Sequence, residues 1–204
     1  MEDILVISKA SIEDLGFLDL SYRKMIWNFF GDACYIGKQY EDIMNSHNEI
    51  IPEALKYRVR LGELCVDKVM PIWDLKTNSD PWLRNLIGLT NSYLYAGTSA
   101  KTLYNEYCDY VDFLMFSSSG TYMIVAEATT KLAQRAFYDI ELIEPNYNKY
   151  KHDSDMYYTE RDVEYLASMS YAGYMDNRFK WYEEKRKEFW MWYVDEAVPS
   201  VLKS

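Results

Sequence analysis

The chain has 204 residues with a formal net charge of −10, and hydrophobic residues make up 49 % of it. This length fits one domain with a sizeable core, and the hydrophobic content excludes a disordered chain. The acidic balance argues against binding to nucleic acid or to an anionic membrane surface, because both need a basic footprint. It favours a basic protein partner, or solubility alone.

Helical periodicity runs through nearly the whole chain, and no convincing alternating strand pattern is present. The sequence therefore predicts a single all-α domain over residues 1–204, with about seven packed helices, for which solenoid-like stacking of helical pairs is an alternative arrangement. The helices are expected at 11–30, 52–70, 81–97, 99–116, 121–140, 159–173 and 178–198, with a short helix within 32–51.

Gly, Pro and capping residues set these boundaries. Ser11 and Asp14 resemble a capping box at the start of the first helix, and Thr159 and Asp162 resemble another before the sixth. Pro71 is expected to end the second helix, since proline removes a backbone donor. The fifth helix carries several alanines, which would allow a neighbouring helix to approach closely.

The helix predicted over 99–116 has one apolar face and one acidic face. Glu106, Asp109 and Asp112 recur at three-residue steps on the acidic face. A solvated helix side is one interpretation of this pattern, and part of an acidic partner-binding surface is the other.

The segment EPNYNKYKHDSDMYY, between the fifth and sixth helices, is long, polar and rich in tyrosine. Ordered loops of this length are often functional. We therefore take Asp153, Asp155, Tyr157 and Tyr158 as candidate partner contacts. Changing Asp153 and Asp155 to lysine is expected to weaken binding without lowering stability.

The last predicted helix contains the run FWMWY. Phe189, Trp190 and Tyr193 share one stripe of this helix and are expected in the core. Trp192 is the aromatic residue of the run that we expect to be most exposed.

Residues suited to catalysis or metal binding are few. A helical phosphohydrolase of the HD type needs a His, a His-Asp pair and a further Asp as metal ligands. His47, His152, Asp153 and Asp176 supply these nominally, but His152 and Asp153 lie in a predicted loop, far from His47 in the chain. No nucleophile, zinc or phosphate-loop motif occurs. We predict no enzyme activity, no metal site and no cofactor.

The cysteines Cys34, Cys65 and Cys108 are odd in number and widely spaced. We expect reduced, mostly buried thiols in a cytoplasmic protein. The acidic N-terminal stretch is not expected to be a signal peptide, and no run approaches the roughly 18 apolar residues of a membrane span.

The C-terminal third resembles a family of bacterial immunity proteins from polymorphic toxin systems, the all-α type numbered five. The resemblance is carried by R-x-E-F-W-x-W-Y and an E-A-V-P ending, that is, by Arg186, Glu188, Phe189, Trp190, Trp192, Tyr193, Glu196, Ala197 and Pro199. The middle of the chain matches at Arg60, Cys65, Val69, Pro71, Trp73, Asp74, Asp80 and Gly97. Trp82 and the ending YLYAG depart from the family pattern, and the resemblance leaves out residues 1–50.

The resemblance implies a non-enzymatic immunity protein that binds and neutralises a cognate toxin by occlusion. Many such toxins are basic nucleases, which an acidic protein would attract. The rival hypotheses are a metal-dependent all-α hydrolase and a generic helical interaction scaffold. The matching residues define the fold more than the contact, so no binding residue is transferred from the family, and the oligomeric state is not predicted.

Overall fold

The computed structural model describes residues 1–34, 40–45, 50–116, 120–139, 142, 152–153, 161–173 and 182–203. Within these residues the regular structure is helical and contains no strand, which confirms the all-α prediction. The elements are α1 (Glu2–Leu15), α2 (Leu20–Phe29), α3 (Tyr40–Asn45), α4 (Glu53–Thr77), α5 (Trp82–Ala96), α6 (Ala100–Phe116), α7 (Thr121–Tyr138), α10 (Val163–Tyr171), α11 (Glu183–Trp192), the π-helix η3 (Tyr193–Ala197) and α12 (Val198–Lys203).

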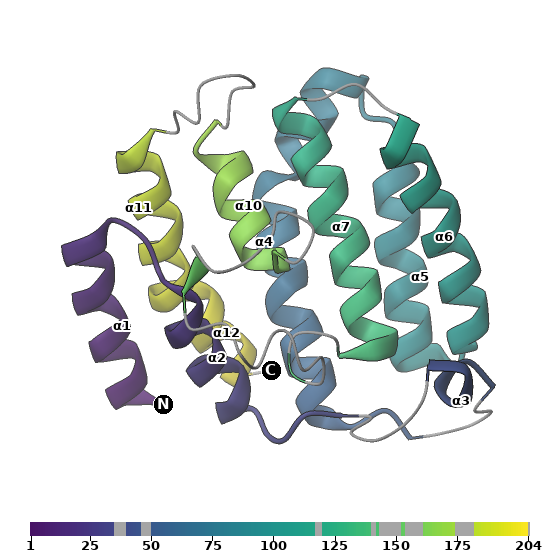
Figure 1. The fold of residues 1–204 in the computed structure, drawn as a ribbon, viewed down its shortest axis with the longest axis horizontal. Helices are drawn as coiled ribbons and strands as arrows, with labels where there is room; N and C mark the ends of the chain where they lie inside the picture. Colours follow the sequence, from purple (N-terminus) through teal and green to yellow (C-terminus); the bar gives the residue numbers. More distant parts are fainter. Residues whose placement is uncertain are drawn as a thin grey trace.

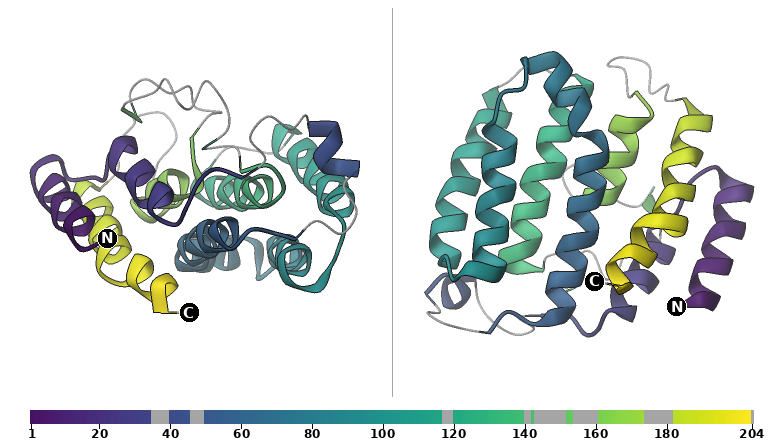
Figure 2. Two further views of the ribbon diagram at one scale, coloured as in Figure 1. Left: turned by 90° about the horizontal axis from the view of Figure 1, so that it is seen from below. Right: turned by 180° about the vertical axis from the view of Figure 1, so that it is seen from behind.

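Helix α7 lies in the middle of the fold and packs against α4, α5, α6 and α10 (Figure 1). Seen from below, α4 and α5 lie in one row and α10, α7 and α6 in a second (Figure 2). Helices α1, α2 and the α11–η3–α12 segment close one side, and α6 lies at the opposite edge. The predicted close packing of the alanine-rich helix is confirmed, since four alanines of α7 are fully buried: Ala126, Ala128, Ala133 and Ala136.

Gly62 marks a tight approach between α4 and its neighbours. A Cβ atom at this position would lie 2.9 Å from Nη1 of Arg135 and 2.9 Å from Cδ1 of Leu132 on α7. It would also lie 3.3 Å from Val163 on α10. Glycine is therefore required here by space, since the three helices pack around the missing side chain.

The predicted helix over 11–30 is wrong, because two helices occupy this region. Helix α1 begins at Glu2 and ends at Leu15, where Gly16 adopts the left-handed conformation with φ of 78° and donates its amide to Ile12. Asp19 then caps α2, because its side chain accepts a hydrogen bond from the Leu20 amide. Ser11 and Asp14 lie inside α1, so they do not form a capping box.

The predicted helix end before Pro71 is also wrong, because α4 continues to Thr77. A proline inside a helix costs about 3 kcal/mol. Burial on the far side of the proline offsets this cost, since Trp73 is only 2 % exposed. The Trp73 indole also donates a 3.0 Å hydrogen bond to the Asp80 carbonyl and so fixes the turn that follows.

The capping residue of α10 is Asp162, whose carboxylate accepts a hydrogen bond from the Tyr165 amide. Thr159, the cap expected from the sequence, lies outside the described residues. The helix therefore begins later than predicted.

The C-terminal aromatic run closes the core. Phe189, Trp190 and Tyr193 are completely buried, which confirms their predicted place. Trp192 is half-buried, with the Lys68 ammonium 4.4 Å from its ring centre. The helix passes through a π-helical turn and continues through Pro199, although the sequence predicts an end there.

Candidate interaction surface

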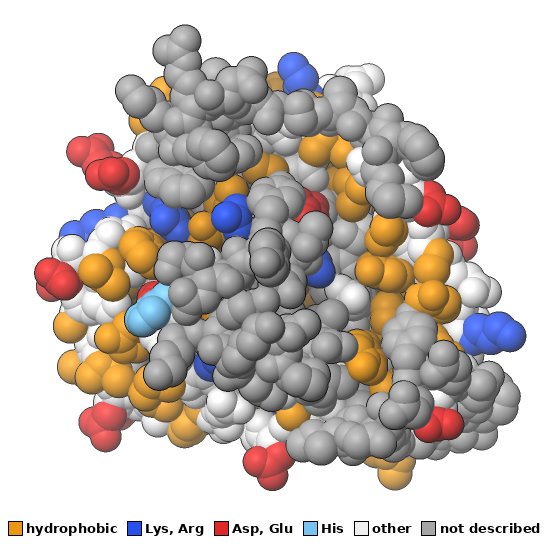
Figure 3. All heavy atoms as spheres, in the orientation of Figure 1, with side chains coloured by type: hydrophobic (Ala, Val, Ile, Leu, Met, Phe, Trp, Pro, Cys, Tyr) orange, Lys and Arg blue, Asp and Glu red, His pale blue; other side chains and the backbone are white. Residues whose placement is uncertain are grey.

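The acidic face predicted on α6 is exposed to solvent. Glu106, Asp109 and Asp112 are all exposed, and no cationic side chain among the described residues forms an ion pair with them. Space-filling atoms show a group of acidic side chains on the upper part of this edge, with a Lys or Arg side chain below them (Figure 3). We call these three residues the acidic row.

An aromatic cluster lies beside the acidic row, where the start of α5 meets the end of α6. The Trp82 ring stacks on Tyr110 at 4.0 Å between centres, and Phe113 meets the Trp82 ring edge-on at 4.1 Å. Phe113 is 42 % exposed. Contact with a partner would therefore remove aromatic surface from water next to three carboxylates.

The Tyr110 hydroxyl fixes this cluster by donating a 2.5 Å hydrogen bond to the Trp82 carbonyl. Burial, together with the nearby charges of Glu106 and Asp80, raises the pKa of Tyr110 to about 12. The hydroxyl therefore stays protonated and acts as a donor at neutral pH. Asp80 fixes the start of α5, since its carboxylate accepts a 2.9 Å hydrogen bond from the Trp82 amide.

A pocket of about 310 Å³ opens between the same two helices. Asn85, Leu86 and Leu89 line it from α5, and Glu106 and Tyr110 line it from α6. The pocket therefore joins the acidic row to the aromatic cluster, because Glu106 belongs to the row and Tyr110 to the cluster.

Only Asp153 can be placed among the residues expected in the tyrosine-rich segment. Its carboxylate is buried and accepts hydrogen bonds of 2.6 and 3.1 Å from Arg23 on α2. Asp155, Tyr157 and Tyr158 lie outside the described residues. Asp153 thus holds its part of the chain to the core instead of facing solvent.

Arg23 is shared by a second carboxylate, Asp162 at the start of α10. Burial opposes the charge on Arg23, but the attraction of Asp153 and Asp162 outweighs it and raises the guanidinium pKa well above its ordinary value. Burial raises the pKa of Asp153, and the Arg23 cation acts against that rise.

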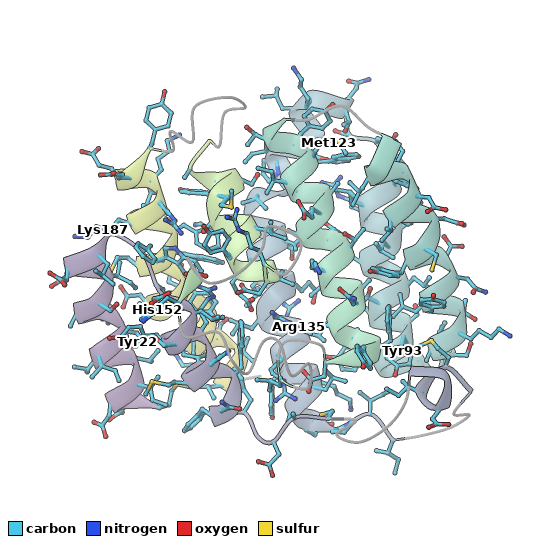
Figure 4. All side chains as sticks on the ribbon, viewed as in Figure 1. Tyr22, Tyr93, Met123, Arg135, His152 and Lys187 are labelled. Atoms are coloured by element: carbon cyan, nitrogen blue, oxygen red, sulfur yellow. The ribbon has the colours of Figure 1, made fainter. Side chains whose placement is uncertain are left out.

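Next to this cluster, the exposed ring of His152 contacts the Asp19 carboxylate through Nδ1 at 2.5 Å. His152 lies over α2, on the same side of the molecule as Tyr22 (Figure 4). Burial opposes the charge of Asp19, but hydrogen bonds from His152 and from the amides of Asp153 and Leu20 hold its pKa below the ordinary value.

Two further arginines are buried with carboxylates. Arg135 on α7 pairs with Glu164 on α10, and Arg58 on α4 pairs with Asp139 after α7. Sequence reasoning missed these pairs, although a charge between apolar neighbours, as in LAQRAF, is a signal that could have found Arg135. They join separate helices through the core, so their role is structural.

The described residues give little support to the alternative of a metal-dependent hydrolase. His47 and Asp176 lie outside the described residues, and His152 and Asp153 are engaged by Asp19 and Arg23. Across the described ranges, no group of three or more His, Cys, Asp or Glu side chains is arranged to hold a metal ion. Among the same residues, no helix is both long enough and apolar enough to cross a membrane.

The fold defines an all-α protein whose helix α6 carries an exposed acidic row beside an aromatic cluster. The chain matches the family described as immunity protein Imm5 over residues 7–200, and it belongs to this family. The match confirms the resemblance and also covers most of the N-terminal region that the resemblance left out. No curated protein matches the chain. Membership of an immunity-protein family implies a cognate toxin as the partner.

Proposed function

We propose that this protein binds a cognate bacterial toxin in the cytoplasm and neutralises it by occlusion, without chemical change to either protein. The observation that carries the proposal is the family match over residues 7–200. Occlusion needs only a stable interface, and the described residues offer an exposed acidic and aromatic surface for one.

The proposed toxin contact is the acidic row of Glu106, Asp109 and Asp112, with the exposed ring of Phe113 beside it. Unpaired carboxylates attract a basic partner over several ångströms and speed its association. Aromatic surface at the centre of an interface then contributes affinity by desolvation. The segment with Asp155, Tyr157 and Tyr158 is the second proposed contact. Asp153, which precedes these residues in the chain, is itself held by Arg23.

Capture of the partner tests the function directly. The tagged protein is purified from its source bacterium under conditions of toxin production, and bound proteins are identified by mass spectrometry. We expect a stoichiometric toxin whose activity is lost at one equivalent of this protein. Toxin released by denaturation and refolded should regain full activity at unchanged mass. Inhibition at far less than one equivalent, or a changed toxin mass, would contradict occlusion.

Charge reversal tests the surface. In one variant the acidic row becomes Glu106→Lys, Asp109→Lys and Asp112→Lys. In the matched control, Asp3, Glu13 and Asp14, which are exposed on distant α1, become lysine. Each reversal adds two charges, so three take both variants from −10 to −4.

We expect the acidic-row variant to associate with the toxin at least about 10-fold more slowly at low salt, and the difference to shrink as salt rises. The α1 variant should show only the smaller effect of net charge. Equal rates for the two variants would remove α6 from the interface.

A further inference from the structure

The α5–α6 pocket has an apolar base and a carboxylate at its rim. Leu86 and Tyr110 are buried at 1 % and 2 % exposure, Leu89 is half-buried, and Glu106 is exposed. Its volume of about 310 Å³ lies at the small end of ligand sites, which span roughly 300–1,000 Å³. This size suits one side chain better than a cofactor.

Charge around the pocket favours a cation. Glu106 forms no ion pair with any described residue, and Asp109 lies one helical turn further along α6. Arg84, the chain neighbour of Asn85, is already engaged, since it donates two hydrogen bonds of 2.5 Å to the carboxylate of Asp74. A cationic side chain entering from solvent would therefore meet an uncompensated carboxylate.

We propose that this pocket receives an arginine side chain of the partner. The methylene groups of the arginine lie mainly on half-buried Leu89, above the buried side chains of Leu86 and Tyr110. Its guanidinium donates to the Glu106 carboxylate and to the Asn85 side-chain carbonyl, which line the pocket from opposite helices. Arginine fits better than lysine because its planar fork presents several donors at once, which can reach Glu106 and Asn85 together. The inference rests on the proposed function, because the toxin would supply the arginine.

A titration with a small probe tests the pocket without the toxin. N-acetyl-arginine methylamide is added to the isotopically labelled full chain, and backbone, methyl and side-chain amide signals are followed by NMR. The control probe is N-acetyl-citrulline methylamide, which has nearly the same shape and no charge. We expect saturable shifts at Leu86, Leu89 and the Asn85 amide with the arginine probe, and at least about 5-fold weaker binding of citrulline.

Two glutamate variants complete the test. Glu106→Gln should abolish the preference for the arginine probe, whereas Glu13→Gln, an exposed glutamate on α1, should leave it unchanged. Equal binding of both probes by the unaltered chain would overturn the proposal, as would a preference for the arginine probe that survives Glu106→Gln, or shifts that do not saturate. A lysine analogue that binds as tightly as the arginine probe would overturn the choice of arginine.

The captured toxin separates this inference from the proposed function. If the toxin binds the Glu106→Gln and Glu13→Gln variants equally tightly, the proposed arginine site is contradicted, whereas the proposed immunity function is not. If the unaltered protein captures no toxin, the proposed function fails, and the probe titration still decides the preference of the pocket. We expect Glu106→Gln to weaken toxin binding at least about 10-fold, mainly through faster dissociation.

Discussion

Arg135 on α7 donates two hydrogen bonds of 2.7 Å to the carboxylate of Glu164 on α10, and both side chains are completely buried. The same guanidinium donates a 3.1 Å bond to the backbone carbonyl of Arg58 on α4. One cation thus joins the three helices that surround Gly62. Its bonds are satisfied only when all three helices are in register.

Breaking this ion pair should destabilise the fold strongly. Glu164→Gln leaves the Arg135 cation buried without a counter-charge, so we expect the free energy of unfolding to fall by about 3–5 kcal/mol. Urea denaturation followed by circular dichroism measures the change. Replacing both partners, as in Arg135→Met with Glu164→Leu, should recover most of the loss, because no charge is then buried alone. A double variant as unstable as the single one would show that the charges themselves are needed.

Gly62 on α4 and Gly88 on α5 allow the same substitution to be compared at a crowded and at an open position of a helix. Gly62→Ala forces a Cβ atom to within 2.9 Å of Arg135 and Leu132, and such overpacking costs about 1–3 kcal/mol. Gly88 lies exposed within α5 with nothing within 4 Å of an added Cβ atom, so Gly88→Ala should stabilise by about 0.5–1 kcal/mol. Urea midpoints that move in the same direction for both variants would contradict this account.

The helices that the sequence predicts well are those whose ends carry strong local signals. Pro81 and Gly97 bracket α5, and the boundaries of α6 and α7 also lie close to the expected ones. The break at Gly16 was missed because the apolar pattern continues across it, and the passage of α4 through Pro71 depends on tertiary burial of Trp73. Tertiary packing determines the break at Gly16 and the continuation of α4 through Pro71, and the local sequence around these residues does not indicate either.

The acidic row was predictable because three-residue spacing on an amphipathic helix fixes which side chains face solvent. The place of Asp153 was not predictable. Its neighbours are polar, but its partner, Arg23, lies 130 residues away in the chain. Completely buried arginines such as Arg23 contradict the usual interpretation of charge as a solvated face.

Reversal of Asp153 should therefore lower stability, contrary to the expectation from sequence. Asp153→Lys places a second cation against the Arg23 guanidinium in a buried site, and we expect a loss of at least about 3 kcal/mol. Asp109→Lys, on the exposed face of α6, is the control and should change stability by less than about 0.5 kcal/mol. Thermal unfolding of the two variants compares them. Equal melting temperatures would mean that Arg23 does not depend on Asp153.

Asp19 should make stability fall in acid. Its pKa in the folded protein is lowered from 3.8, so its contribution to stability is complete above the unfolded value and is lost as pH falls through the lower folded value. Asp19→Asn removes this titration and keeps a good helix cap. The difference in unfolding free energy between the two proteins should shrink as pH falls below 3.8. A difference that stays constant down to acid unfolding would contradict the assignment.

The cysteines should differ sharply in reactivity. Burial, followed by the nearby charge of Asp139, raises the pKa of Cys34 to about 11, and burial raises that of fully enclosed Cys65 well above its ordinary value. Both thiols stay protonated at neutral pH, and only a thiolate attacks an alkylating reagent. Cys108 is half-buried on α6. Native protein treated with iodoacetamide near pH 8 should therefore label first at Cys108, as read by peptide mass spectrometry.

The Cys108→Ser variant provides the control for this experiment. It should label at least about 100-fold more slowly than the unaltered chain, and in denaturant both remaining thiols should react fully. Rapid labelling of Cys34 in the native variant would show that the segment holding it beside Arg58 and Asp139 opens readily. In that case the 2.7 Å hydrogen bond from the Cys34 amide to Asp139 would not keep this end of α7 closed in solution.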